Sequence, residues 1–202
     1  HDTVRRQRQM CIRDRLFWEP NSDVYQRFEF KWGTTEFEAD ETYAGLTEAD
    51  IAANPRRRYA GTFLDHMSTE HTRTYLKYLV EPADNLTIQV AGYYNEFERD
   101  WYKINKAGGQ SVSKVVADPI TYAAAYDDLR LLGVGSLGIK HNSRGYNSKG
   151  VQFNFDYDTE LGGVAHNITG GARMHSDSIR RFQQQDTIDL SGDAPVVVEG
   201  AL

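Results

Sequence analysis

A hairpin pattern over residues 73–104 constrains the fold more than any other feature of the sequence. In the second arm, the residues of one face alternate with the more polar residues of the other: Leu86, Ile88, Val90, Gly92 and Tyr94 against Thr87, Gln89, Ala91, Tyr93 and Asn95. A period of two is that of a pleated strand. The first arm alternates too, with Thr74, Leu76, Tyr78 and Val80 on one face. The polar segment 81–85, which contains a proline and Asx residues, favours a chain reversal.

The length of this hairpin points to a membrane. At about 6.7 Å per two residues, the apolar face of residues 86–94 covers roughly 25 Å, the height of the lipid-facing band of an outer-membrane barrel. The arm continues to residue 104, with Phe97, Trp101 and Tyr102 among charged residues. Such an aromatic girdle is typical of a strand that leaves the bilayer. The alternative is a long edge hairpin of a soluble β-sandwich.

The rest of the chain alternates short turns with long loops. Short turns are expected at 19–23, 81–85 and 159–165, and long loops at about 39–70, 105–133 and from 183. The first two long loops contain short helix-like segments, 46–55 and 120–132. Strands are expected at 24–38, 71–81, 86–104, 136–158 and 166–182, with the end of another at 16–18. This asymmetry predicts an all-β fold, an antiparallel transmembrane β-barrel wall with short periplasmic turns and long extracellular loops. So few strands predict part of a larger barrel.

The first 15 residues differ from the remainder. They contain five arginines and no apolar period. We expect residues 1–15 to be a non-native segment similar to translated sequencing adapter, and residues 16–202 to be a partial barrel domain. A basic arm is the alternative.

Composition and motifs exclude several functions. The formal net charge of −6 argues against a nucleic-acid partner. Cys11 is the only cysteine, so neither an internal disulfide nor a multi-cysteine metal site is expected. His66 and His71 are five residues apart, which suits neither one helical face nor one strand face, so we predict no metal site. The sequence contains no G-x-S-x-G elbow, H-E-x-x-H motif or P-loop, and we predict a protein that is not an enzyme, with an outer-membrane hydrolase barrel as a further alternative.

Four segments carry a resemblance to a known family: ETYAGLTEADIAANPRRRYAGT (41–62), YNEFERDWYKI (94–104), IKHNSRGYNSKGVQF (139–153) and GARMHSDSIRRFQ (171–183). Over residues 16–192 the chain resembles the TonB-dependent outer-membrane receptors, in particular those similar to ferric citrate receptors. The resemblance implies a 22-stranded barrel filled by an N-terminal plug, in the outer membrane of a Gram-negative cell. It also implies import of a ferric chelate, such as ferric citrate or a siderophore, powered by the TonB-ExbB-ExbD complex. We expect this sequence to cover part of the barrel without the plug and the TonB box.

A ferric chelate of this kind is anionic, so its capture needs fixed cations. The ligand-binding residues that we predict are Arg56, Arg57 and Arg58 in the first long loop, and Arg99, Arg144 and Arg173 on the strands. Arg180 and Arg181 are further candidates, whereas Gln152, Asn154 and Arg173 could instead form the polar wall that faces the plug. Arginines in such loops also pair with acidic residues or lipid phosphates. No catalytic residue, metal ligand or cofactor is predicted. The alternative from another class is a soluble carbohydrate-binding module, with Trp32 and Trp101 as a stacking platform.

Overall fold

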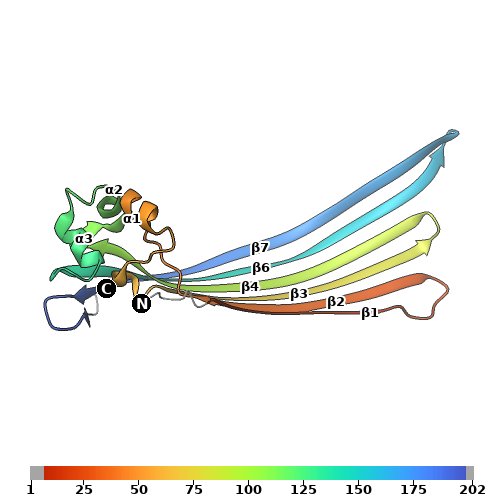
Figure 1. Ribbon diagram of the computed structural model, residues 1–202. Helices are drawn as coiled ribbons and strands as arrows, with labels where there is room; N and C mark the ends of the chain where they lie inside the picture. Colours follow the sequence, from red (N-terminus) through yellow and green to blue (C-terminus); the bar gives the residue numbers. More distant parts are fainter. Residues whose placement is uncertain (1–6, 199–202) are drawn as a thin grey trace.

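The computed structural model of the protein describes residues 7–198, which form one antiparallel sheet with a small helical cap at one end (Figure 1). The sheet order is β1-β2-β3-β4-β6-β7-β8, and β5 pairs with β4. The strands are β1 (Gln7–Trp18), β2 (Tyr25–Ala39), β3 (His66–Ala83), β4 (Leu86–Ala107), β5 (Gln110–Ser111), β6 (Ser136–Leu161), β7 (Val164–Asp189) and β8 (Val196–Val198). The sheet curves along the length of its strands. The predicted all-β antiparallel fold is therefore confirmed.

The hairpin over residues 73–104 is present with the predicted faces. Val80 pairs with Ile88 and Tyr78 with Val90, so the apolar sides of β3 and β4 coincide. The same register continues into β6, where Val90 pairs with Phe153. The turn after β6 is tighter than predicted, because Gly162 and Gly163 both have positive φ (64° and 80°), which allows a two-residue connection.

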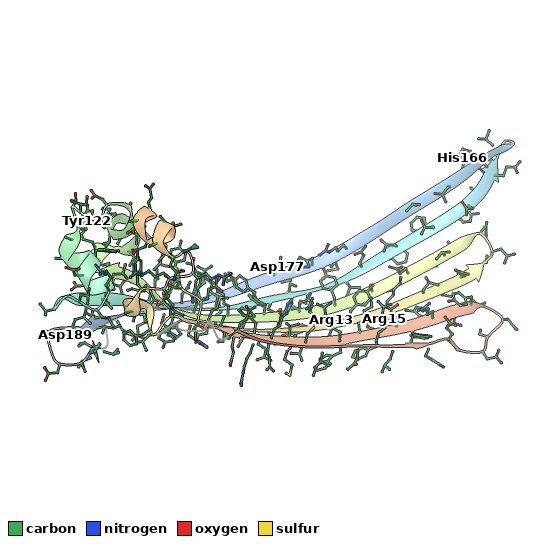
Figure 2. All side chains as sticks on the ribbon, in the orientation of Figure 1. Arg13, Arg15, Tyr122, His166, Asp177 and Asp189 are labelled. Carbon is green, nitrogen blue, oxygen red and sulfur yellow. The ribbon has the colours of Figure 1, made fainter. Side chains whose placement is uncertain are left out.

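One face of the sheet exposes large apolar side chains, which a soluble sheet would cover. Apolar side chains are exposed along one face, including Leu76 (54%), Val151 (55%) and Met174 (82%). The neighbouring polar-face residues, such as Lys77 and Gln152, are half-buried. Figure 2 shows side chains projecting from both sides of the long strands. We call the two sides the apolar face and the polar face.

Several predicted boundaries are wrong because pairing continues further than the apolar pattern does. β7 extends to Asp189, although a loop was expected from residue 183, and β3 begins at His66 rather than at residue 71. The extra length of β7 pairs residues 183–189 with 136–142 of β6. It brings Ile188, only 1% exposed, into the core of the cap, which supplies the reason for the longer strand.

Residues 7–15 form most of β1 and belong to the sheet, although we predicted no strand before residue 16. They pair with residues 31–39 of β2 in continuous register. Asp14 lies opposite Trp32, so it shares the apolar face with that ring. Lys149 of β6 lies on the same face in the same row, so a charged residue there does not distinguish β1 from the other strands. Residues 1–6 lie outside the described range, and the non-native origin of residues 1–15 stays a prediction.

The cap consists of two loops that close over the loop-side ends of β4, β6 and β7 (Figure 1). Loop 1, residues 40–65, holds α1 (Glu48–Ala53) and the 3-10 turn η1 (Ala60–Thr62). Loop 2, residues 108–135, holds β5, α2 (Val112–Ala117) and α3 (Ala123–Leu129). Their shared core contains Tyr59, Ile104, Ala107, Val112, Val115, Ala125, Leu129, Leu137, Ile188 and Leu190. Within residues 7–198, the helices are all too short or too polar to span a bilayer.

A glycine in β6 provides a test of the sheet. A Cβ on Gly150 would lie 2.6 Å from the carbonyl oxygen of Met174 and would also meet the Tyr93 hydroxyl. Because backbone must shift, Gly150→Ala should lower the free energy of unfolding by about 1–3 kcal/mol, measured by urea titration in detergent. Gly92→Ala is the matched control, because its Cβ meets nothing within 4 Å. Equal midpoints for the two variants would contradict the packing described.

Candidate functional site: a cationic cluster beside the cap

Three arginines form a row across the polar face at its loop end. Arg99 of β4 pairs with Arg144 of β6, which pairs in turn with Arg181 of β7. Paired residues of an antiparallel sheet share a face, so the three side chains leave the sheet on the same side. Of the residues predicted to bind ligand, the structure thus brings Arg99 and Arg144 together. Arg181 joins them through the register.

Two lysines extend this row towards the cap. Lys103 pairs with Lys140, four residues further along the strands than Arg99 and Arg144, and the pair Trp101 and Asn142 lies between the two rows. We call the set of Arg99, Lys103, Lys140, Arg144 and Arg181 the cationic cluster. We did not predict the two lysines from the sequence, although their spacing of four residues from Arg99 and Arg144 places them on the same face.

The cationic cluster has little internal compensation. Within residues 7–198, none of its five members makes an ion pair within 4 Å. The Nε atoms of Arg99 and Arg144 are buried, and among the described residues they find no hydrogen-bond partner. Burial lowers the pKa of Lys103, and the neighbouring charges of Arg99, Lys140 and Arg144 lower it further. An anion is the counter-charge that this arrangement lacks.

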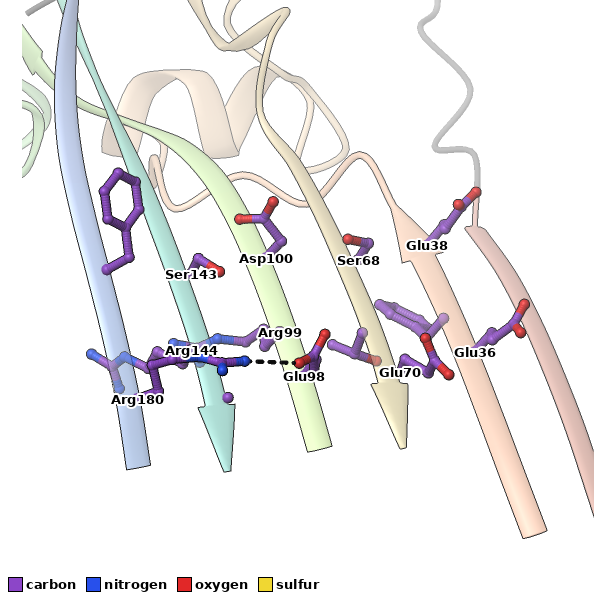
Figure 3. A pocket seen from close by; sticks show the side chains of 14 residues that line it. Glu36, Glu38, Ser68, Glu70, Glu98, Arg99, Asp100, Ser143, Arg144 and Arg180 are labelled. Atoms are coloured by element: carbon purple, nitrogen blue, oxygen red, sulfur yellow. Dashed lines mark hydrogen bonds and ion pairs between the residues drawn. The ribbon is translucent and has the colours of Figure 1, made fainter. Parts of the chain in front are cut away.

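Acidic residues occupy the opposite side of the sheet at the same level. Glu36, Glu70 and Glu98 pair in a row across β2, β3 and β4. Figure 3 shows them beside a hollow of about 460 Å³, together with Arg180, whose Nη2 lies 3.2 Å from Glu98. Arg180 is thus on the other face from Arg181. The register places the three glutamates on the opposite side of the sheet from the cationic cluster, although Arg99 and Arg144 also line the edge of this hollow.

Arg173 lies apart from the cationic cluster, eight residues along β7 from Arg181. Its Nε donates to the Tyr93 hydroxyl at 3.0 Å, and its guanidinium lies 5.4 Å from the centre of the Tyr93 ring. The same hydroxyl is 2.5 Å from Nδ1 of His175. The register pairs Arg173 with Gln152, consistent with the alternative role of both residues as part of a polar wall.

The arginines of loop 1 lie in the cap. Arg57 pairs with the Asp50 carboxylate. Arg58 donates to the Thr62 hydroxyl and to the Asp40 carbonyl, each at 2.7 Å. The Arg56 side chain is exposed. Binding of a ligand by Arg57 or Arg58 would require them to give up these contacts, and the role of all three residues stays a prediction.

Two buried carboxylates hold the cap together. Asp50 of α1 accepts hydrogen bonds from the hydroxyls of Thr47, Tyr59 and Tyr126, the last of which comes from α3 in loop 2. Burial opposes the charge of Asp50, but these hydroxyls and Arg57 lower its pKa to about 2. Asp65, 1% exposed, accepts from the Ile104 backbone N–H at 2.7 Å and so ties loop 1 to β4.

The histidines considered as metal ligands do not meet. His66 and His71 leave β3 on opposite faces, because they are five residues apart. His66 Nδ1 lies 3.2 Å from Asp40, and His71 packs edge-on against Phe97. Within residues 7–198, no group of three or more His, Cys, Asp or Glu side chains is arranged to hold a metal ion.

The sheet and its cap define part of a β-barrel wall, and comparison with solved structures supports this fold. The chain is similar to the ferric citrate transporter FecA in its unliganded form, with a TM-score of 0.58 and 17% identity over 92% of this chain. It is also similar to the siderophore receptor PiuA from Acinetobacter baumannii, with a TM-score of 0.52 and 12% identity over 93%. The chain spans about a quarter of these proteins, 23% and 24%. No protein-family model and no curated protein matches the sequence.

Asp65 makes the stability of the cap depend on pH. Burial raises its pKa to about 6, from the 3.8 of an exposed aspartate, despite hydrogen bonds and the nearby Arg58. The folded protein therefore keeps a proton that the unfolded chain releases. The stability from this proton is complete below about pH 4 and is lost as the pH rises through 6.

We expect the wild-type cap to lose roughly 3 kcal/mol between pH 4 and pH 8, and the Asp65→Asn variant to lose none of it. Exchange of the Ile104 amide, corrected for the intrinsic effect of pH, measures this difference. Asp50 does not affect this measurement. Its pKa is lowered, so its contribution to stability is complete above about pH 4 and is lost only as the pH falls towards 2. The exposed Glu48→Gln variant is the control and should keep the wild-type profile. A wild-type profile in Asp65→Asn would contradict the assignment.

Proposed function

We propose that this chain forms part of the barrel wall of an outer-membrane receptor that binds an anionic ferric chelate and imports it with energy delivered through TonB. The observation that carries the proposal is the cationic cluster on the polar face, whose five cations make no ion pair within 4 Å among the described residues. The two similar structures, a ferric citrate transporter and a siderophore receptor, support a chelate as the ligand. Energy from the TonB-ExbB-ExbD complex rests on the resemblance of the four sequence segments.

The geometry of the cationic cluster suits a ligand with several carboxylates. Neighbouring strands lie about 4.8 Å apart, so the three-arginine row spans about 10 Å. Guanidinium groups bind carboxylates through paired hydrogen bonds, and several of them can bind one polyanion at once. In this proposal the chelate holds the iron, and the protein binds the chelate. We propose no catalytic step and no resident cofactor.

The exposed apolar face supports a membrane location. Side chains such as Leu76 and Val151 would contact lipid in the outer membrane, and the polar face would line the lumen of the barrel. A β-sandwich needs a second sheet over the apolar side, whereas all strands in residues 7–198 belong to one sheet. Trp32 and Trp101 lie on opposite faces, so they do not form the single stacking platform of a carbohydrate-binding module.

Lipid contact is testable at one position of β4. In the full-length receptor, Val90→Arg places a charge on the apolar face, where Val90 lies between Tyr78 and Phe153. We expect a cost of about 2–4 kcal/mol and a loss of folded protein in the outer membrane. Heat-modifiable mobility of the membrane fraction on gels measures assembly. The adjacent Gln89→Arg faces the lumen and should assemble normally; normal assembly of Val90→Arg would exclude the proposed orientation.

Ligand binding is testable on neighbouring arginines. The double variant Arg99→Gln, Arg144→Gln removes two charged donors from the cationic cluster and should weaken binding of ferric citrate by about 10- to 100-fold. Titration calorimetry of the full-length receptor measures the affinity. Arg180→Gln is the matched control, because Arg180 lies on the other face beside Glu98 and should bind as wild type. If the wild type, the double variant and Arg180→Gln bind ferric citrate with equal affinity, the cationic cluster is not part of the binding site.

A further inference from the structure

One lysine of the cationic cluster is held between two aromatic rings. The Nζ of Lys103 lies 3.9 Å from the centre of the Tyr43 ring and 4.0 Å from that of the Trp101 ring. The two rings meet edge to face, with centres 5.7 Å apart. Trp101 belongs to β4, whereas Tyr43 belongs to loop 1. The ammonium group thus joins a loop to the wall of the sheet.

The same short piece of loop 1 has a second contact with the wall. Trp101 Nε1 donates to the carbonyl oxygen of Glu41 at 3.2 Å. The Arg99 guanidinium lies 5.7 Å from the centre of the Trp101 ring. Residues 41–43 therefore lie directly beside the cationic cluster. The Tyr43 side chain is 67% exposed, whereas the neighbouring Ala44 packs against the cap core.

Lys103 makes no ion pair within 4 Å among the described residues. Arg99, Lys140 and Arg144 repel its ammonium group, and Asp65 attracts it weakly. The ring faces of Tyr43 and Trp101 attract an ammonium group through their quadrupoles, and this attraction is weaker than that of a hydrogen-bonded carboxylate. A carboxylate bound in the cationic cluster would compete with the two rings for the Lys103 ammonium.

We propose that Lys103 is a coupling residue that holds residues 41–45 of loop 1 against β4 when the cationic cluster is empty and releases them when an anion binds. The polyanion draws the ammonium away from the rings, and Tyr43 then loses its partner. This inference rests on the proposed function, since it uses the same cationic cluster. The inference adds to the proposed function a residue, Lys103, that transmits the binding of an anion to loop 1.

Hydrogen exchange of residues 41–45 in the full-length receptor tests the coupling, with ferric citrate and iron-free citrate as probes. In the wild type, saturating ferric citrate should speed exchange at least threefold. Lys103→Met keeps the length of the side chain but removes its charge. Its exchange should be at least threefold faster than wild type without any anion, and ferric citrate should cause no further change.

Two controls separate charge from packing. Lys103→Arg keeps a cation that stacks on aromatic rings, and it should retain the response to ferric citrate. Lys106→Met changes an exposed lysine of the same strand that does not belong to the cationic cluster, and it should behave as wild type. Loss of the response in Lys106→Met, or its persistence in Lys103→Met, would overturn the role of Lys103.

Calorimetry on the same samples distinguishes the two proposals. If ferric citrate binds but wild-type exchange stays the same or slows, the coupling is wrong and the proposed function stands. If neither probe binds, the proposed function fails for these ligands and the coupling to an anion fails with it. The role of Lys103 in holding residues 41–45 is still tested by Lys103→Met in the absence of anions. If hydrogen exchange of these residues equals that of the wild type, this role is wrong.

Discussion

Antiparallel pairing in continuous register carries each face of one strand onto the same face of the next. Two bulges interrupt it, one between Val80 and Ala83 and the other between Ile104 and Lys106. Between them the alternation stays in phase across β2, β3, β4, β6 and β7. Because a slip of one residue would exchange the faces, this pairing sets both the apolar face and the cationic cluster. Arg99, Arg144 and Arg181 are far apart in sequence, and only the pairing of β4, β6 and β7 makes them neighbours.

The strands could be predicted from the sequence because their signal is local. Residues 86–94 and 151–157 alternate with a period of two, and the turns between strands contain residues that reverse a chain. The faces of Val90, Gln152 and Phe153 followed directly from this pattern. The ends of β3 and β7 could not be found in the same way. The composition of residues 183–189 predicts a polar loop. These residues extend β7 instead, because they pair with residues 136–142 of β6 and because the cap buries Ile188.

The candidate site was predictable only in part. The sequence shows that Arg99 and Arg144 are cations on the polar side of strands, but only the register shows that they are neighbours. The run of three arginines in loop 1 attracted the prediction of a ligand site, whereas Arg57 and Arg58 bind Asp50 and oxygens within the cap. Asp50 and Asp65 are buried by contacts with segments distant in sequence, so no local pattern distinguishes them from exposed carboxylates.

The bond between Asp50 and Tyr126 has a consequence for the order of folding. It joins α1 to α3 across 76 residues, and both hairpin arms of β3 and β4 lie between them. Closing so long a segment is entropically unfavourable until the strands have paired and brought its ends together. The cap should therefore form late, after β3 and β4 have paired. Protection of its amides would then report completed assembly of the wall beneath it.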